Sequence, residues 1–422
     1  MSHPFDVVTM HPETLVDEGA LSAITGGYLQ VLCEMGGRPR SSHSTPDGDV
    51  PSFLLVATGG SERAVLDWWE QHRRSLPDGA LRLIAHPGNN SLPAALEVMA
   101  RLQQEDTPGR IFYLRGSDDA SGLRQISEAI ADHVARRALE RARIGVLGPP
   151  SDWLVASMPD AATVKATWGP TIVSIAMDEA VAGFEAVGDT DVQRRVDDLV
   201  TAADDVREPT GAELRDVARV SLSLDSIVAH HQLDALTVRC FDLVLNQKTT
   251  GCFALARLVD QGVVAGCEGD LMSTVGMLWT KELLGATPWM ANPAQLDPEA
   301  NTLWLAHCTV PRSLVSSHDL RSHFESGLGV GIQGVFPPGP VTLLRIGGRT
   351  MDRVWLAEGE ITRSGAAENL CRTQVEIGLS DEGGSVDDLL RAPLGNHLVL
   401  VTGHHLQRLR RWCSSSTLRI SP

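Results

Sequence analysis

The residues best suited to chemistry stand at 263–271, where the sequence VVAGCEGDL places a thiol and two carboxylates after an apolar run. The run is typical of a buried strand, and Cys267, Glu268 and Asp270 lie where that strand leads into a helix beginning near Met272. Because residues two apart in an extended segment point the same way, Glu268 and Asp270 can share one face. There they could bind a divalent ion or accept a proton from carbon. Asp270 could instead cap the helix, but that role fits Glu268 poorly because Glu268 stands before the cap.

Two histidines at strand ends extend the candidate centre. His307 follows the apolar residues LWLA, and His397 precedes the apolar residues LVLV. One such histidine is usually structural, but two of them in a chain that also carries Glu268 indicate a metal site or a general acid. Oxygen and imidazole ligands favour Mn²⁺, Mg²⁺ or Co²⁺. Zinc is less favoured, because no short C-x-x-C or H-E-x-x-H spacing occurs.

Several polar residues elsewhere are candidate substrate contacts. Asn89 and Asn90 stand in HPGNNS at a corner between a strand and a helix, where loop side chains of α/β domains face ligand clefts. His323 stands in SHFESG, a loop that could reach the site or face solvent. Cys267 is a further candidate, although burial as a small apolar group is its alternative.

Arginines are relevant because a strongly anionic ligand would need them in a chain of this acidity. Arg63, Arg239 and Arg345 are the candidates. Arg239 could contact a substrate directly, or it could form an ion pair with Asp242 near the cleft.

The elements that must position these residues follow three patterns along the chain. Residues 1–140 repeat an apolar strand followed by a helix, which predicts a Rossmann-like α/β domain with a parallel sheet. Residues 141–300 begin the same plan again and carry Glu268. Residues 301–422 contain short strands separated by Gly and Pro, which predicts a β-rich, barrel-like domain. The predicted fold class is therefore α/β, with two consecutive Rossmann-like domains followed by a β-rich C-terminal domain.

Composition narrows the classes of partner. A formal net charge of -17 disfavours nucleic acids and anionic membrane surfaces as partners. No stretch approaches the roughly 18 apolar residues that a membrane helix needs. Seven scattered cysteines do not suggest a disulfide framework, and the polar start MSHPFDVV does not resemble a signal peptide. We therefore expect a cytoplasmic protein with a small-molecule substrate.

Taken together, these segments resemble the L-fucose/L-arabinose isomerase superfamily, in particular its shorter, fucose isomerase-like members. The resemblance covers nearly the whole chain and lies in the order of its segments: ATGGSE, HPGNNSLPAALE, GPPSDWLVAS, LTVRCFDLV, GCEGDL, NTLWLAHCTVP, HFESGLGVGIQG, PGPVTLLRIGG and GNHLVLVTG.

The resemblance implies an enzyme that interconverts aldoses and ketoses through an enediol with a divalent metal, usually Mn²⁺. It implies that Glu268 in CEGD is the first metal-binding acid and that His397 in GNH is the metal-binding histidine. His307 resembles a further histidine that some members place beside the metal. Relatives form trimers or hexamers in which an N-terminal domain covers a neighbour's site, so Asn89 and Asn90 could serve the next subunit.

The second acid is where this sequence departs from the resemblance, because Asn292 occupies its position. An asparagine carbonyl can coordinate a hard cation, but it carries no charge and cannot take a proton. Asp270 could compensate for the missing acid. Alternatively the same fold catalyses a different step, such as that of a lyase, an epimerase or a ring-forming enzyme. A non-catalytic sugar-binding protein is the third hypothesis.

Overall fold

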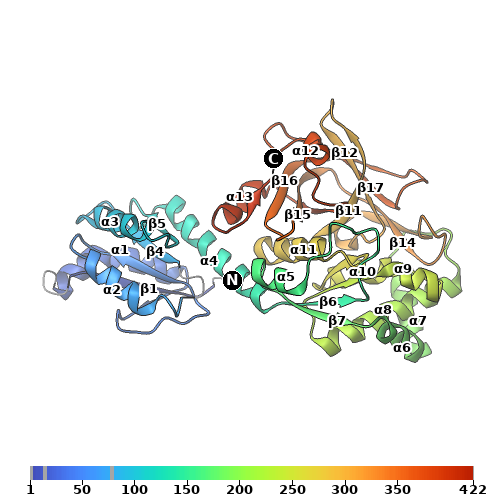
Figure 1. The fold of residues 1–422 in the computed structure, drawn as a ribbon, viewed down its shortest axis with the longest axis horizontal. Coiled ribbons are helices and arrows are strands. Elements are labelled where there is room, and N and C mark those ends of the chain that lie inside the picture. Colours follow the sequence, from blue (N-terminus) through green and yellow to red (C-terminus); the bar gives the residue numbers. More distant parts are fainter. Residues whose placement is uncertain (1–2, 13–16, 77–79, 422) are drawn as a thin grey trace. The chain divides into compact units, whose positions relative to one another are not determined.

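The computed structural model describes residues 3–12, 17–76 and 80–421. The chain forms two compact units, Met1–Arg137 and Ala138–Pro422, and each unit is described by itself (Figure 1). The domain boundaries predicted at residues 140 and 300 stay predictions. Among the described residues, every helix is too short or too polar to cross a membrane.

The first unit is a parallel sheet of five strands in the order β2-β1-β3-β4-β5. Its strands are β1 (Phe5–Met10), β2 (Gly37–Arg40), β3 (Ser52–Val56), β4 (Leu81–Ala85) and β5 (Gly109–Tyr113). Its helices are α1 (Glu18–Glu34), α2 (Glu62–His72), α3 (Ser91–Gln103) and α4 (Ala120–Arg141), which continues past the end of the unit.

Alternating side chains on these strands build two cores, one on each face of the sheet. Phe53 and Leu55 of β3 pack with residues of α1 and α4, whereas Leu54 and Val56 pack with residues of α2 and α3. Helices therefore cover both faces, as the repeated pattern of strand and helix predicts.

The second unit begins with a parallel sheet of four strands in the order β10-β9-β6-β7. These strands are β6 (Arg143–Leu147), β7 (Thr171–Ile175), β9 (Ala235–Val238) and β10 (Val264–Cys267). The helical segments of this part are α5 (Ala161–Thr167), α6 (Met177–Ala186), α7 (Asp189–Thr201), α8 (Gly211–His231), α9 (Cys240–Asp242), the π-helix η1 (Leu243–Gln247), α10 (Cys252–Asp260) and α11 (Leu271–Leu284).

An antiparallel β-barrel follows, closed by the pairing of β15 with β16 around the order β15-β18-β11-β12-β17-β16. Its strands are β11 (Trp289–Asp297), β12 (Thr302–His307), β15 (Gly339–Gly347), β16 (Arg353–Gly365), β17 (Thr373–Leu379) and β18 (Leu398–Thr402). β19 (Arg419–Ile420) is added to β16, and a small sheet joins β8 (Asp205–Val206), β13 (Ser317–Arg321) and β14 (Gly331–Val335). The remaining helices are the 3-10 helix η2 (Arg312–Leu314), α12 (Val386–Arg391) and α13 (Leu406–Ser414). The predicted fold class, with parallel sheets followed by a barrel, is confirmed.

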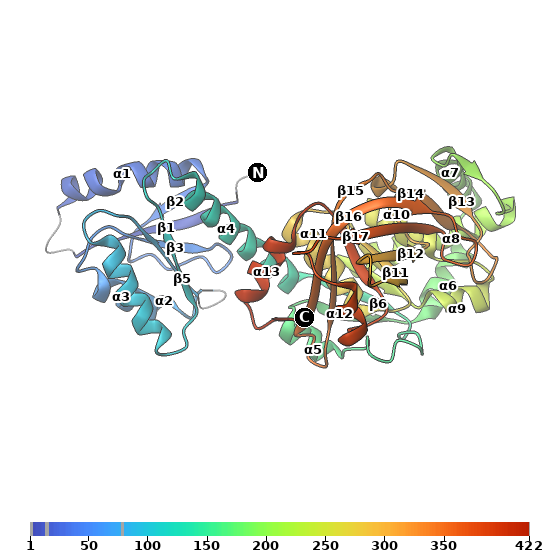
Figure 2. The same cartoon turned by 90° about the horizontal axis from the view of Figure 1, so that it is seen from above.

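Helix α11 packs between the parallel sheet and the barrel. It lies beside β15 in both views (Figures 1 and 2). Gly276 permits this close approach, since a Cβ there would lie 3.1 Å from Leu344 and 3.4 Å from Val399. Because α11 starts directly after the loop that follows β10, this packing brings Glu268 and Asp270 to the part of the barrel where β12 ends at His307 and His397 precedes β18.

Candidate active site

The loop after β10 presents Glu268 from an unusual backbone conformation. Glu268 has φ +62° and Gly269 has φ +74°, both in the left-handed region. A Cβ on Gly269 would lie 2.7 Å from Pro150 Cα, so this position requires glycine. The backbone N–H of Ser151 donates to the carbonyl of Glu268 at 2.9 Å. The loops after β6 and β10 therefore hold each other and fix where the Glu268 side chain points.

The two carboxylate oxygens of Glu268 face different partners. Oε2 accepts a hydrogen bond from Trp153 Nε1 at 2.6 Å. Oε1 lies 3.8 Å from His397 Nε2, which is too far for a hydrogen bond. Trp153 is 50% exposed and meets Phe241 edge to face at 5.0 Å, while Phe241 meets His323 at 5.9 Å. An aromatic surface therefore lies beside the exposed part of the carboxylate.

Asp270 is the N-cap of α11 and is completely buried. Its carboxylate accepts from Ser273 N at 2.8 Å, from Arg345 Nη1 at 2.9 Å and from His397 Nδ1 at 3.0 Å. Burial alone would raise the pKa of Asp270, but the charge of Arg345 and the hydrogen bond with His397 together lower that pKa below its usual range. The ionised carboxylate is thus positioned to orient His397, and no surface of it is open to a substrate.

This contact decides which nitrogen of His397 carries the proton. An ionised Asp270 can only accept, so Nδ1 of His397 is the donor. In the neutral tautomer with this donor, Nε2 carries the lone pair. That Nε2 is buried and has no hydrogen-bond partner among the described residues. A buried lone pair facing a carboxylate oxygen is the arrangement that a shared cation would satisfy.

His307 contributes a second imidazole. It ends β12, its ring lies 5.5 Å from that of His397, and its Nδ1 lies 2.8 Å from Thr309 Oγ1. Burial first, and the neighbouring His397 second, lower the pKa of His307 to about 3. The ring is therefore uncharged at neutral pH.

Asn292 lies on β11, the strand between β12, which ends at His307, and β18, which begins just after His397. In β11, Asn292 pairs with Ala306, the residue before His307, and Ala291 pairs with Leu398, the residue after His397. The Asn292 side chain is half-buried, and within the described part of the chain it makes no hydrogen bond. Its amide is therefore not engaged by another side chain among these residues.

The chemistry of these donors fits a divalent ion. Two ligands that share an ion at about 2.1 Å each lie at most roughly 4.2 Å apart, and the Glu268–His397 separation of 3.8 Å is within that limit. Over the ranges that the structure describes, Glu268, His397 and His307 do not form a group whose ligand atoms all lie within 4.8 Å of one another. Another group, Glu179, His230 and His231, does meet that spacing.

Buried thiols lie beneath the site. Cys267 Sγ lies 3.0 Å from Cys240 Sγ, and both residues are buried. The hydrogen bond with Cys240, followed by burial, raises the pKa of Cys267 well above its ordinary value. Cys267 is therefore a neutral thiol that faces Cys240, and its predicted contact with a substrate stays a prediction.

The predicted arginines are all engaged with acids. Arg239 donates to Asp242 at 2.9 Å, as its alternative predicts, and to Asp152 at 3.1 Å. Arg63 pairs with Asp67 at 3.0 Å in the first unit. Arg345 is 1% exposed and bound to Asp270, and its contact with an anionic ligand stays a prediction.

The remaining predicted contacts are placed as follows. Asn89 and Asn90 are exposed residues of the first unit with φ +54° and +57°, between β4 and α3. His323 is buried, with Nδ1 3.1 Å from Ser326 Oγ, and contacts Phe241 as described. Sequence reasoning missed Trp153, whose only signal was its place just after the GPPSD turn that follows β6.

No family model matches the chain. Sulfoquinovose isomerases from Priestia aryabhattai and from Priestia megaterium (strain ATCC 12872 / QMB1551) are each 22% identical over 432 residues, covering 98% of this chain and 90% of theirs. A sulfoquinovose isomerase from Clostridium sp. (strain MSTE9) is 27% identical over 192 residues, covering 43% of this chain and 42% of its own. The chain is thus similar, over nearly its whole length, to proteins that carry the name sulfoquinovose isomerase.

Proposed function

We propose that this protein is an aldose–ketose isomerase for a small sugar, with its reaction centre at Glu268 and His397. The observation that carries the proposal is the buried Nε2 of His397, which has no hydrogen-bond partner among the described residues and is held 3.8 Å from Glu268 Oε1 by the ionised Asp270. The similarity to sulfoquinovose isomerases supports the reaction class.

Glu268, His397, His307 and Asn292 are the residues that would hold a divalent ion, for which we propose Mn²⁺ before Mg²⁺ or Co²⁺. When bound, such an ion supplies a Lewis acid that polarises the sugar carbonyl and acidifies the adjacent C–H and O–H groups.

Proton transfer is the role we assign to Glu268. Its carboxylate takes the proton from C2 of the aldose and returns it to C1, while a hydroxyl proton moves from O2 to O1, so the sugar isomerises without net loss of atoms. Trp153 holds the carboxylate through its N–H and offers its exposed ring to the apolar face of a sugar. Asp270 and Arg345 act through His397, as positioning residues.

Asn292 favours a second candidate, a same-fold enzyme with changed chemistry such as a lyase or an epimerase. A neutral amide cannot relay the proton that a second acid would relay. A non-catalytic sugar-binding protein is the remaining alternative from the sequence.

The deciding experiment is incubation with a panel of sugars in D₂O with Mn²⁺, including sulfoquinovose and neutral aldoses, followed by NMR. We expect ketose formation with deuterium at the exchanged carbon, loss of turnover with EDTA, and recovery with Mn²⁺.

Glu268→Gln should abolish turnover while keeping the circular dichroism spectrum. The matched control is Glu299→Gln, at an exposed position in the turn that follows β11, which should turn over normally. Turnover retained by Glu268→Gln would overturn the assignment, and a product other than a ketose would favour the changed-chemistry candidate.

We further propose a cytoplasmic homo-oligomer, a trimer or a hexamer, on the strength of the resemblance found in the sequence. In that assembly Asn89 and Asn90 would contact the substrate of a neighbouring subunit. Light scattering coupled to size-exclusion chromatography measures the mass of the assembly, and a monomeric mass would contradict this part of the proposal.

A further inference from the structure

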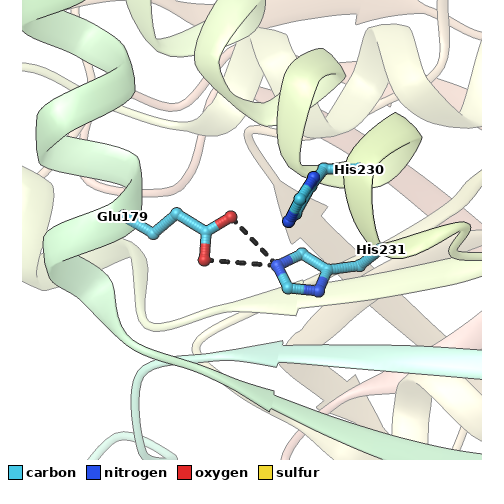
Figure 3. A group of neighbouring side chains, drawn as sticks. All are labelled: Glu179, His230 and His231. Atoms are coloured by element: carbon cyan, nitrogen blue, oxygen red, sulfur yellow. Dashed lines mark hydrogen bonds and ion pairs between the residues drawn. The ribbon is translucent and has the colours of Figure 1, made fainter.

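A second group of possible ligands lies outside the candidate active site, between helices α6 and α8. His230 and His231 form the last turn of α8, and Glu179 lies in the first turn of α6. Figure 3 shows the Glu179 carboxylate and one nitrogen of each ring facing the same space. His231 Nε2 lies 2.9 Å and 3.2 Å from the two Glu179 oxygens, and the ligand atoms of all three residues lie within 4.8 Å of one another.

The helices that carry these residues are fixed without any ion. Ser223 Oγ of α8 donates to the Ala180 carbonyl of α6 at 2.9 Å. The end of α8 is also held, because Arg143 Nε donates to the His231 carbonyl at 3.1 Å and Gln232 closes the helix with φ +53°. The three ligands are therefore brought together by the fold, at little further cost in conformational entropy.

The location is separate from Glu268. His231 lies before β9 begins and contacts Arg143, the first residue of β6, whereas Glu268 follows the last residue of β10. Because these strands are parallel, His231 lies at the amino edge of the sheet and Glu268 at its carboxyl edge.

The ligand chemistry selects the ion. Two imidazoles and one carboxylate, partly open to solvent, are a typical set of protein ligands for Zn²⁺ that leaves a position for water. A histidine–glutamate hydrogen bond joins Glu179 and His231, and the His230 ring lies 4.7 Å from that of His231, with its ligand nitrogen within reach of the same ion. The negative net charge of the chain further favours cations.

We propose that Glu179, His230 and His231 bind one Zn²⁺ ion and join α6 to α8. This site needs no substrate and does not depend on the reaction proposed above.

The test is titration of the full chain with Zn²⁺ by isothermal calorimetry, in a Glu268→Gln background so that the candidate active site contributes less. His230→Ala removes one ligand and keeps the Glu179–His231 pair, and Glu179→Gln removes the charge. The matched control is His404→Ala, which removes an exposed histidine 3.0 Å from Glu358.

We expect about one equivalent of Zn²⁺ in the background protein and in the His404→Ala control. In His230→Ala and Glu179→Gln the affinity should fall by at least about tenfold, and the rise in melting temperature on adding Zn²⁺ should be lost. If both variants bind Zn²⁺ as tightly as the control, or the background protein binds none, the proposal is overturned.

Discussion

Glu268 illustrates how a single residue can carry a cost in stability at a functional position. Its φ of +62° is a conformation in which a side chain is disfavoured by about 1–2 kcal/mol relative to glycine. Strain of this kind collects at sites where the surrounding structure imposes it. Here the loop contact through Ser151 and the Trp153 hydrogen bond impose it.

The strain predicts an order of stability between two variants that both lose the carboxylate. Glu268→Gly should be more stable than Glu268→Ala by about 1 kcal/mol, because only the alanine side chain resists the left-handed backbone. Urea unfolding of the two proteins measures the difference. Equal stability, or a more stable alanine variant, would contradict the backbone account.

Asp270 combines a helix cap with a buried ion pair, so its removal should cost more than the loss of a cap alone. Asp270→Ala leaves Arg345 buried without its partner, which costs about 3–5 kcal/mol. The matched control is Asp160→Ala, an exposed N-cap that accepts from Thr163 N at 2.7 Å, for which about 0.5–2 kcal/mol is expected. Chemical denaturation compares them, and similar losses would show that the pair with Arg345 contributes little.

At the scale of elements, the sequence predicts most of what surrounds the site. The strand ends that carry Glu268, His307 and His397 follow from local apolar runs, and the cap role of Asp270 follows from its position before a helix. The contact of Trp153 with Glu268 and that of Arg345 with Asp270 join residues far apart in the chain, so no local pattern reveals them. Helix α3 begins after Asn90, which takes the cap position without a side-chain cap hydrogen bond, and Ser91 inside the helix donates its hydroxyl to the Val56 carbonyl.

In the first unit, His86 ties three elements together as a neutral ring. Its Nε2 donates to the Ala57 carbonyl after β3 at 3.2 Å, its Nδ1 accepts from Gly88 N at 3.2 Å, and Tyr28 of α1 stacks on it at 5.0 Å. Burial lowers the pKa of His86, and the hydrogen bond to Ala57 offsets only part of that shift. A proton on Nδ1 would also remove the acceptor for Gly88.

This arrangement predicts a pH dependence of stability. Because the pKa of His86 is lower in the folded than in the unfolded chain, the unfolded chain binds the proton more tightly. Stability is therefore full above the ordinary histidine pKa of about 6.5 and falls as pH decreases below it, by at most about 1.4 kcal/mol per pH unit. Urea unfolding at pH 7.5 and pH 5.5 should show a larger loss for the wild type than for His86→Asn. The same loss in both would contradict the role of His86.

At the scale of the whole molecule, the two units have separate hydrophobic cores. Phe53 belongs to a core of the first unit and Phe253 to the main core of the second, and both are essentially buried. Each unit is large enough to fold cooperatively.

The separate cores predict two unfolding transitions that respond to different substitutions. Phe53→Ala and Phe253→Ala should each cost about 3–5 kcal/mol, because each leaves a cavity in its own core. Differential scanning calorimetry should show that each variant lowers a different transition. A single transition lowered equally by both substitutions would mean that the chain unfolds as one cooperative body.

The most direct test of the proposed centre is a crystal structure of the protein soaked with Mn²⁺, read from the anomalous difference map. We expect one strong peak between Glu268 Oε1 and His397 Nε2, absent from crystals of Glu268→Gln treated in the same way. A catalytically active protein whose manganese peak lies elsewhere, or that shows none, would contradict the account.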